Sequence, residues 1–184
     1  MTPNGDTPAA RARNPLRIPM WTLFAVMLLT PLVAMRFTHE VDWTVSDFSV
    51  FGAMLATVGL AYELVARASG STTYRAGLGL ALGTAFLLVW ANLAVGIIGD
   101  EGDRANLLFF GVLAIGFVGA AVARFQARGM ALAVLVMAGA QAAVSLTTLL
   151  LGWDTKGPLI ALGFAALWVA SAGLFAVAAR QPAS

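Results

Sequence analysis

Residues 90–110 read WANLAVGIIGDEGDRANLLFF and decide the fold class of this chain. A long apolar run ends there in a short acidic segment, residues 100–104, and a second apolar run begins directly after it. Two such runs joined by a charged turn are typical of a helical hairpin that crosses a membrane twice. The stretch therefore predicts a polytopic membrane protein with this turn on one side of the bilayer.

The composition agrees with a lipid environment. Hydrophobic residues make up 60% of the 184 residues and charged residues 11%, against roughly 45–50% and 25% in soluble domains. The length suits one domain. The bilayer is thus the first partner that the sequence implies.

Six apolar runs are long enough to cross a hydrocarbon layer of roughly 30 Å. They are residues 18–35, 48–66, 76–98, 105–123, 129–151 and 158–179. Membrane strands are disfavoured because the runs are continuous rather than alternating, and a sheet in lipid would need closed edges. We predict an all-α fold of six transmembrane helices in antiparallel hairpins, since the short connections make successive helices neighbours.

The two ends of the chain are polar. Residues 1–17 are rich in Pro and small polar residues and include Arg11, Arg13 and Arg17, which predicts a mobile basic tail. A cleaved signal peptide is the alternative for this end. We favour an uncleaved first helix, because the run 18–35 exceeds a normal signal core and its Leu32-Val33-Ala34 is a poor cleavage site. Residues 181–184 form a second short tail.

The basic residues fix the predicted orientation. With six spans, most of them fall on the side of the amino terminus: Arg11, Arg13, Arg17, Arg67, Arg75, Arg124, Arg128 and Arg180, against Arg36, Arg104 and Lys156 opposite. By the positive-inside rule both termini are predicted to be cytoplasmic. Aromatic residues flank the predicted spans on both sides: Trp43 and Trp153 outside, Trp21 and Tyr74 inside.

Several polar and small residues are explained by helix ends and packing. Ser46 or Asp47 is expected to cap the second helix and Asp103 the fourth, and Gly157-Pro158 is expected to begin the sixth. Glu63 and Arg67 have the spacing of a helical ion pair, although a proton-relay role for an intramembrane carboxylate is the alternative. Glycines allow close helix contact and occur in series: Gly52 and Gly59, Gly79 and Gly83, and Gly111, Gly116 and Gly119.

A few polar residues interrupt the apolar runs: Thr30, Thr57, Asn92, Gln141 and Ser145. They lie at similar distances from the outer helix ends, about 9 to 16 Å deep at a 1.5 Å rise per residue. Two interpretations stay open for this polar layer. It either supplies interhelical hydrogen bonds or lines a small cavity that opens outward, with Asn92 and Gln141 as its central pair.

A second candidate site is an outer acidic rim made of His39, Glu40, Asp42, Asp100, Glu101 and Asp103. Carboxylates with an imidazole could hold a divalent cation. The spacing does not match an EF-hand loop, which needs alternating ligands and a distal Glu. A solvated acidic face is therefore the favoured interpretation, and no metal site is predicted.

The sequence disfavours catalysis, cofactors and nucleic-acid binding. Zero cysteines exclude thiolate metal sites, iron–sulfur ligation and cysteine nucleophiles within the chain, and His39 is the single histidine. Neither a nucleophile-elbow motif nor a phosphate-binding loop is present. The net charge of +2 is dispersed over loops, unlike the basic stripe of a nucleic-acid binder. We expect no enzyme, no bound cofactor and no nucleic-acid partner.

The chain resembles an uncharacterised group of small bacterial multi-helix membrane proteins with no assigned activity. The resemblance covers most of residues 20–128 and lies in the segments DWT (42–44), DF (47–48), GLAYEL (59–64), WANLAVGIIG (90–99) and ANLLFFG (105–111). The resemblance implies a location in a bacterial cytoplasmic (inner) membrane, and it implies no substrate, cofactor or partner.

Two functional hypotheses remain. In the first, the chain is a non-enzymatic membrane component that acts by helix packing, as a homo-oligomer or with another membrane protein. In the second, it is a small carrier or channel for a cation or small solute, with the polar layer as an outward-facing site. A closed core around Asn92 and Gln141 would favour the first hypothesis.

Overall fold

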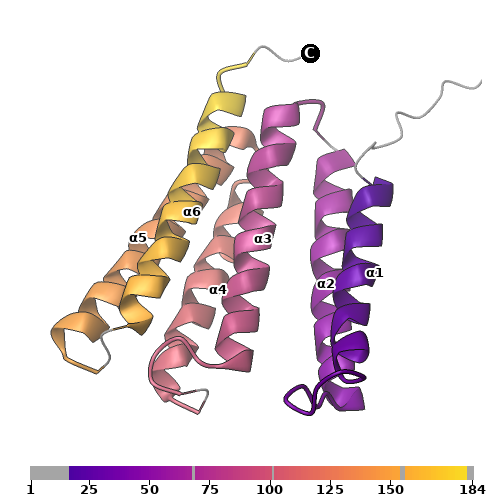
Figure 1. Ribbon diagram of the computed structural model, residues 1–184. Helices are drawn as coiled ribbons and strands as arrows, with labels where there is room; N and C mark the ends of the chain where they lie inside the picture. The colour runs from indigo at the N-terminus through magenta and orange to yellow at the C-terminus, as the bar shows by residue number, and fades with distance from the viewer. Residues whose placement is uncertain (1–16, 68, 101, 154–155, 182–184) are drawn as a thin grey trace, which may run out of the picture. The chain divides into compact units, whose positions relative to one another are not determined.

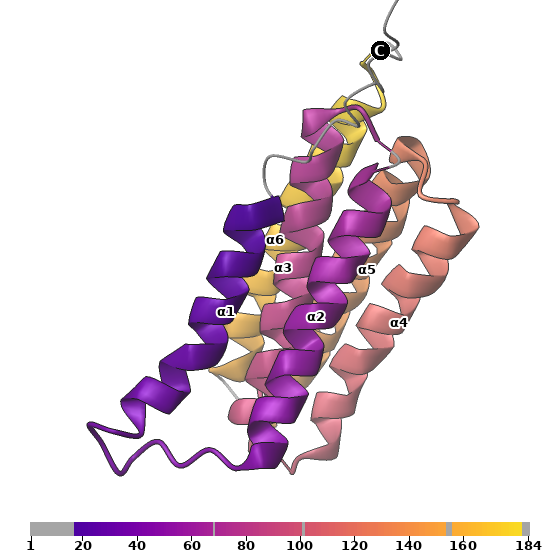
Figure 2. The same ribbon diagram turned by 90° about the vertical axis from the view of Figure 1, so that its right-hand side faces the viewer.

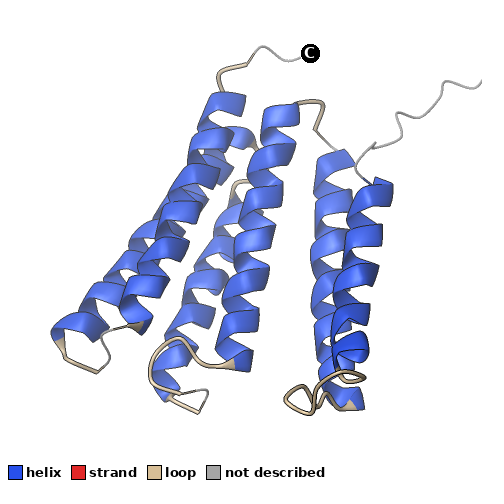
Figure 3. Cartoon of the chain, viewed as in Figure 1, coloured by secondary structure: helices blue, strands red, loops and turns tan. Residues whose placement is uncertain are grey.

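The computed structural model describes residues 17–67, 69–100, 102–153 and 156–181. This part of the chain is helical and contains no strand (Figure 3). Six α-helices and one 3₁₀ turn follow in order: α1 (Arg17–Ala34), α2 (Val45–Arg67), α3 (Thr72–Ala94), η1 (Arg104–Asn106), α4 (Leu107–Val122), α5 (Ala127–Leu150) and α6 (Gly157–Ala178). By length and composition, all six helical segments could cross a membrane. The predicted six-helix, all-α class is thus confirmed, whereas residues 1–16 and 182–184 of the predicted tails lie outside the described residues.

The largest difference from the predicted bounds concerns α3. Its predicted span was residues 76–98, but the helix runs from Thr72 to Ala94. At its start, Ser71 is the N-cap and its side chain accepts a hydrogen bond from the Tyr74 amide. At its end, the chain leaves the helix while still apolar, and Gly96 adopts a left-handed conformation with φ of 70°. The prediction from apolar length alone therefore places both ends of this helix four residues too late.

The chain divides into two compact units, Met1–Gly59 and Leu60–Ser184, and the boundary falls within α2. In the first unit, two aromatic rings of α1, those of Trp21 and Phe24, pack against Gly59 of α2. A Cβ atom at Gly59 would lie 3.0 Å from Trp21 Cη2 and 3.1 Å from Phe24 Cε2. Outside α1, the Trp43 ring packs edge-on against Phe48 and Phe51.

The beginning of α2 carries a reciprocal cap. The Asp47 carboxylate accepts hydrogen bonds from the Thr44 amide at 2.7 Å and from the Thr44 hydroxyl at 2.8 Å. The Asp47 amide donates back to Thr44 Oγ1 at 3.3 Å. Thr44 is thus the capping residue, with Asp47 as its partner three positions later, whereas the sequence favoured Ser46 or Asp47 for this role.

In the second unit, α6 is the principal neighbour of both α3 and α5, and α4 packs on α5 (Figures 1 and 2). Short loops predict the α4–α5 and α5–α6 contacts but not the α3–α6 contact. At that contact, Gly77 lies against Leu174 and Phe175, and Ser171 Oγ donates to Gly77 O at 2.8 Å. Tyr74 adds an edge-on ring contact with Phe175.

Glycines also set the contact between α4 and α5. A Cβ atom at Gly119 would lie 2.7 Å from Ala133 Cβ, and one at Gly116 would overlap Met137. Gly111, by contrast, has no atom within 4 Å of such a Cβ position. Of the predicted glycine series on α4, Gly116 and Gly119 therefore lie at the contact with α5, and Gly111 does not.

We expect Gly119→Ala to destabilise the protein and Gly111→Ala to leave it unchanged or stabilise it. The Gly119 methyl group would push on Ala133 and α5, at a cost of about 1–3 kcal/mol for overpacking. At Gly111 the same methyl group enters open space and gains helix propensity of up to about 1 kcal/mol. Thermal unfolding of both variants in detergent micelles, followed by circular dichroism, measures the difference. Equal melting temperatures would contradict the close α4–α5 contact.

Candidate functional site

The turn between α3 and α4 is organised by one buried side chain, Asn106. Its Oδ1 accepts hydrogen bonds from the Ile97 and Ile98 amides, both at 2.9 Å. Its Nδ2 donates to Ile98 O at 3.1 Å and to Asp100 O at 2.7 Å. Asn106 is only 5% exposed. Both of its donors and both acceptor positions are therefore used to close the turn.

The acidic residues of this turn shape the backbone. Asp100 Oδ1 accepts from the Gly102 amide at 2.9 Å, and Asp103 Oδ1 accepts from the Ala105 amide at 2.8 Å. Asp103 is thereby the N-cap of η1, which leads directly into α4. Gly99 has a φ of 66°, and a Cβ there would lie 2.8 Å from Asp103 Oδ2. Asp103, predicted to cap the fourth helix, thus caps the 3₁₀ turn before it, and the N-cap position of α4 itself is Asn106.

The part of the chain that the structure describes contains five of the six residues of the acidic rim. No group of three His, Cys, Asp or Glu side chains there could hold an ion. Its members are divided between the units: His39, Glu40 and Asp42 lie in the first, Asp100 and Asp103 in the second. Glu101 lies outside the described residues. Two of the carboxylates, Asp100 and Asp103, are instead engaged by backbone amides.

The two threonines of the predicted polar layer bond within their own helices. Thr30 Oγ1 donates to Val26 O at 2.8 Å, and Thr57 Oγ1 donates to Ala53 O at 2.7 Å. Both belong to the first unit. Each hydroxyl proton is satisfied four residues back along the helix, which is the usual fate of a threonine inside a helix.

The other three residues of the layer are buried in the second unit. Asn92 is 4% exposed, and Gln141 and Ser145 are 0% exposed. Asn92 Nδ2 donates to Leu88 O at 2.8 Å, and Ser145 Oγ donates to Gln141 O at 2.9 Å. Gln141 is the member that reaches another helix, because its Nε2 lies 3.3 Å from Ala161 O in α6.

The structure adds three unpaired buried atoms to this picture. Asn92 Oδ1, Gln141 Oε1 and Trp168 Nε1 have no hydrogen-bond partner. Two of them are acceptors and the third, the indole N–H of Trp168, is a donor. The sequence argument missed Trp168, although its position ten residues inside the run 158–179 is too deep for an interfacial aromatic residue. Each unpaired atom in an apolar interior costs about 1–3 kcal/mol.

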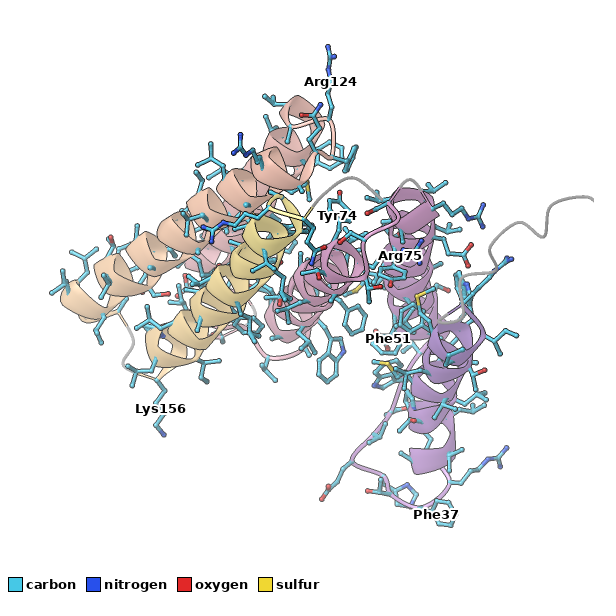
Figure 4. All side chains as sticks on the ribbon, turned by 90° about the horizontal axis from the view of Figure 1, so that it is seen from above. Phe37, Phe51, Tyr74, Arg75, Arg124 and Lys156 are labelled. Atoms are coloured by element: carbon cyan, nitrogen blue, oxygen red, sulfur yellow. The ribbon has the colours of Figure 1, made fainter. Side chains whose placement is uncertain are left out.

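A second set of polar contacts gathers at the opposite end of the second unit, around the start of α3. Tyr74 Oη donates to Phe125 O at 2.6 Å, in the turn between α4 and α5. That turn contains two consecutive left-handed residues, Arg124 with φ of 47° and Phe125 with φ of 58°. Figure 4 shows Arg124 pointing away from the helices. The Tyr74 hydroxyl thus holds a strained turn in place, beyond the role of interfacial aromatic residue predicted for it.

The start of α3 also binds the side chain of Gln181, which follows α6. Ser71 Oγ donates to Gln181 Oε1 at 2.8 Å, and Gln181 Nε2 donates to Thr73 Oγ1 at 2.9 Å. Arg75 Nε lies 3.2 Å from Ala66 O and 3.0 Å from Ser69 O. These bonds join the α2–α3 connection and Gln181, three residues after the end of α6, to the start of α3.

The predicted ion pair near the end of α2 is present. Arg67 Nη2 donates to Glu63 Oε2, and the Glu63 side chain is nearly buried while that of Arg67 is largely exposed. The pair spans one helical turn, as the sequence predicts. Its geometry supports the structural interpretation of Glu63, because the carboxylate has its counterion on the same helix.

Comparison with known proteins finds no relatives of this chain. The chain matches no protein-family model, and neither curated proteins nor solved structures give a significant match.

We expect Asn106→Leu to destabilise the protein far more than Asn92→Leu. The first change leaves two amides and two carbonyls of the α3–α4 turn without their partner, and each unpaired group costs about 1–3 kcal/mol. The second removes a side chain with a single hydrogen bond and an unpaired oxygen. Both variants place leucine at a buried asparagine, so unfolding in detergent compares them directly. If Asn92→Leu proved the more damaging, Asn106 would not be the organiser of the turn.

Proposed function

We propose that this protein is a non-enzymatic component of a bacterial cytoplasmic membrane that acts by packing against another membrane helix. Six apolar helices make it a multi-pass membrane protein. Charge supports an orientation with both termini in the cytoplasm. In the second unit, Arg67, Arg75, Arg124, Arg128 and Arg180 lie at one end of the helices, and Asp100, Asp103, Arg104 and Lys156 at the other.

The outward face of α6 carries this proposal. Gly163, Ala166, Ala170 and Gly173 are all exposed and recur at intervals of three and four residues, so they form one stripe along the helix. A Cβ atom at Gly163 or Gly173 would have no atom within 4 Å. At the internal contacts, by contrast, neighbouring side chains occupy the space beside glycines such as Gly77 and Gly119.

Small residues on an exposed membrane helix allow another helix to approach at close range. Between membrane helices the hydrophobic effect supplies no drive, so close van der Waals contact and weak backbone contacts supply the affinity. The opposite face of α6 is occupied by α3 and α5. The stripe is therefore the side of α6 on which a partner helix, from a second copy or another membrane protein, would pack.

We expect Ala170→Leu to remove the partner and Val169→Leu to retain it. Both positions are exposed and adjacent, but only the first lies on the stripe, where added bulk would hold a partner helix away. Native mass spectrometry after extraction from membranes in a mild detergent measures the composition of the complex. A complex that survives Ala170→Leu, or a wild-type chain with no partner, would refute the proposal.

A second candidate function is transport of a cation or a small polar solute. It is favoured by one observation, the unpaired acceptor oxygens of Asn92 and Gln141 among buried side chains. Amide oxygens with nearby hydroxyls, such as that of Ser145, are ligands that hard cations accept. The complete enclosure of Gln141 and Ser145 supports the packing role instead, since neither is open to the outside.

Measuring ion flux across liposome membranes distinguishes transport from the packing role. If the protein carries potassium or sodium ions, Asn92→Leu and Gln141→Leu should reduce flux at least about tenfold, equivalent to about 1.4 kcal/mol in the barrier. Thr57→Val is the matched control, because its hydroxyl bonds within its own helix. Wild-type flux equal to that of protein-free liposomes would eliminate the transport hypothesis for these ions.

A further inference from the structure

Three exposed arginines at one end of the second unit have no counterion among the described residues. They are Arg124, Arg128 and Arg180. The other two arginines at this end are engaged by the protein, since Arg67 pairs with Glu63 and Arg75 Nε donates to two backbone carbonyls. This end of the unit therefore carries positive charge that its own described side chains do not neutralise.

Hydrogen bonds from the start of α3 hold together the segments that carry this charge. Tyr74 Oη donates at 2.6 Å to the carbonyl of Phe125, the residue that follows the first of the three arginines. Ser71 Oγ donates at 2.8 Å to the side chain of Gln181, the residue that follows the last of them. Arg128 lies between these segments in sequence, in the first turn of α5. The α4–α5 turn and the end of α6 are thus fixed at the same helix end.

The α4–α5 turn presents apolar side chains beside its arginines. Val122 and Phe125, two residues before Arg124 and one after it, are 79% and 47% exposed. Arg124 points away from the helices (Figure 4). At the end of a membrane helix, exposed apolar side chains lie among acyl chains, while long cationic side chains extend to the headgroups. The turn therefore offers apolar surface and positive charge side by side, which suits a phospholipid better than a soluble anion.

The charge of Arg128 is not compensated within its own helix. The first turn of α5 has no acidic residue, and Gln126 at the N-cap position makes no side-chain hydrogen bond. The amino terminus of a helix adds a partial positive charge, so an arginine there is unfavourable until an anion lies nearby. A phosphate group can accept paired hydrogen bonds from a guanidinium group. An anion held by the two arginines of the turn would thus relieve this repulsion.

We propose that the α4–α5 turn binds the headgroup of an anionic phospholipid, with Arg124 and Arg128 as its cationic contacts and Arg180 adding charge at the same end. A zwitterionic lipid carries a positive group that offsets its phosphate, so the turn prefers lipids with net negative charge. The proposal rests on the membrane location of the chain and not on the stripe of α6. Loss of the partner helix would therefore leave it intact.

Native mass spectrometry of the full chain in detergent tests this preference. Dioleoylphosphatidylglycerol and dioleoylphosphatidylcholine, added in turn, have identical acyl chains and differ in net charge. We expect the anionic lipid to bind about thirtyfold more tightly, a ratio equivalent to about 2 kcal/mol for two arginines at a charged surface. Equal affinity for the two lipids would overturn the proposal, and the same spectra report separately whether a protein partner is bound.

The double variant Arg124→Gln with Arg128→Gln tests the turn itself, and we expect it to lose most of the preference. Arg104→Gln with Lys156→Gln is the matched control, because it removes two positive charges at the opposite end of the helices and should retain the preference. Glutamine at position 124 meets the same left-handed backbone as arginine, so circular dichroism should give equal melting temperatures. A preference that survives in the first variant, or falls equally in the control, would refute the site.

Discussion

Hydrogen bonding without water is the constraint on which this structure depends. In hydrocarbon, a backbone amide or carbonyl that leaves the helical pattern has to find its partner inside the protein. The chain meets this demand at the end of α3, where Asn106 accepts from two amides and donates to two carbonyls. One side chain thereby allows an apolar segment to leave its helix and turn. At Thr30, Thr57 and Ser145 the demand is met more simply, by a bond to the preceding turn of the same helix.

Close packing supplies the second part of the architecture. Gly77 brings α3 against α6, and Gly119 brings α4 against α5. The Ser171 hydroxyl crosses to a carbonyl of α3 at the first of these contacts. The interior thus combines short-range van der Waals contact with a few hydrogen bonds, as expected of helices that gain nothing from the hydrophobic effect in lipid.

Much of this fold could be predicted from the sequence, because membrane spans are read from apolar length. Six runs gave six helices, and Asp103, Pro158 and the pair formed by Glu63 and Arg67 have the local roles that their positions suggest. The end of α3 could not be predicted in this way. Val95, Ile97 and Ile98 are as apolar as the helix before them, and the reason to stop lies eight or nine residues later, in the side chain of Asn106. Depth along a helix likewise suggested a polar layer, but it could not reveal that Thr30 and Thr57 bond within their own helices or that Trp168 presents an unpaired donor.

Because α3 packs mainly on α6, a helix that is synthesised early has its principal neighbour in a helix that is synthesised late. Gly77 receives the Ser171 hydroxyl from a residue 94 positions later, and Ser71 meets Gln181 after 110 positions. The start of α3 is therefore synthesised well before the residues that it contacts in and after α6. Tyr74 is likewise synthesised before its partner in the α4–α5 turn, Phe125, which lies 51 residues later. Among the described helices α6 is synthesised last, so a chain truncated before α6 would lack the principal neighbour of both α3 and α5.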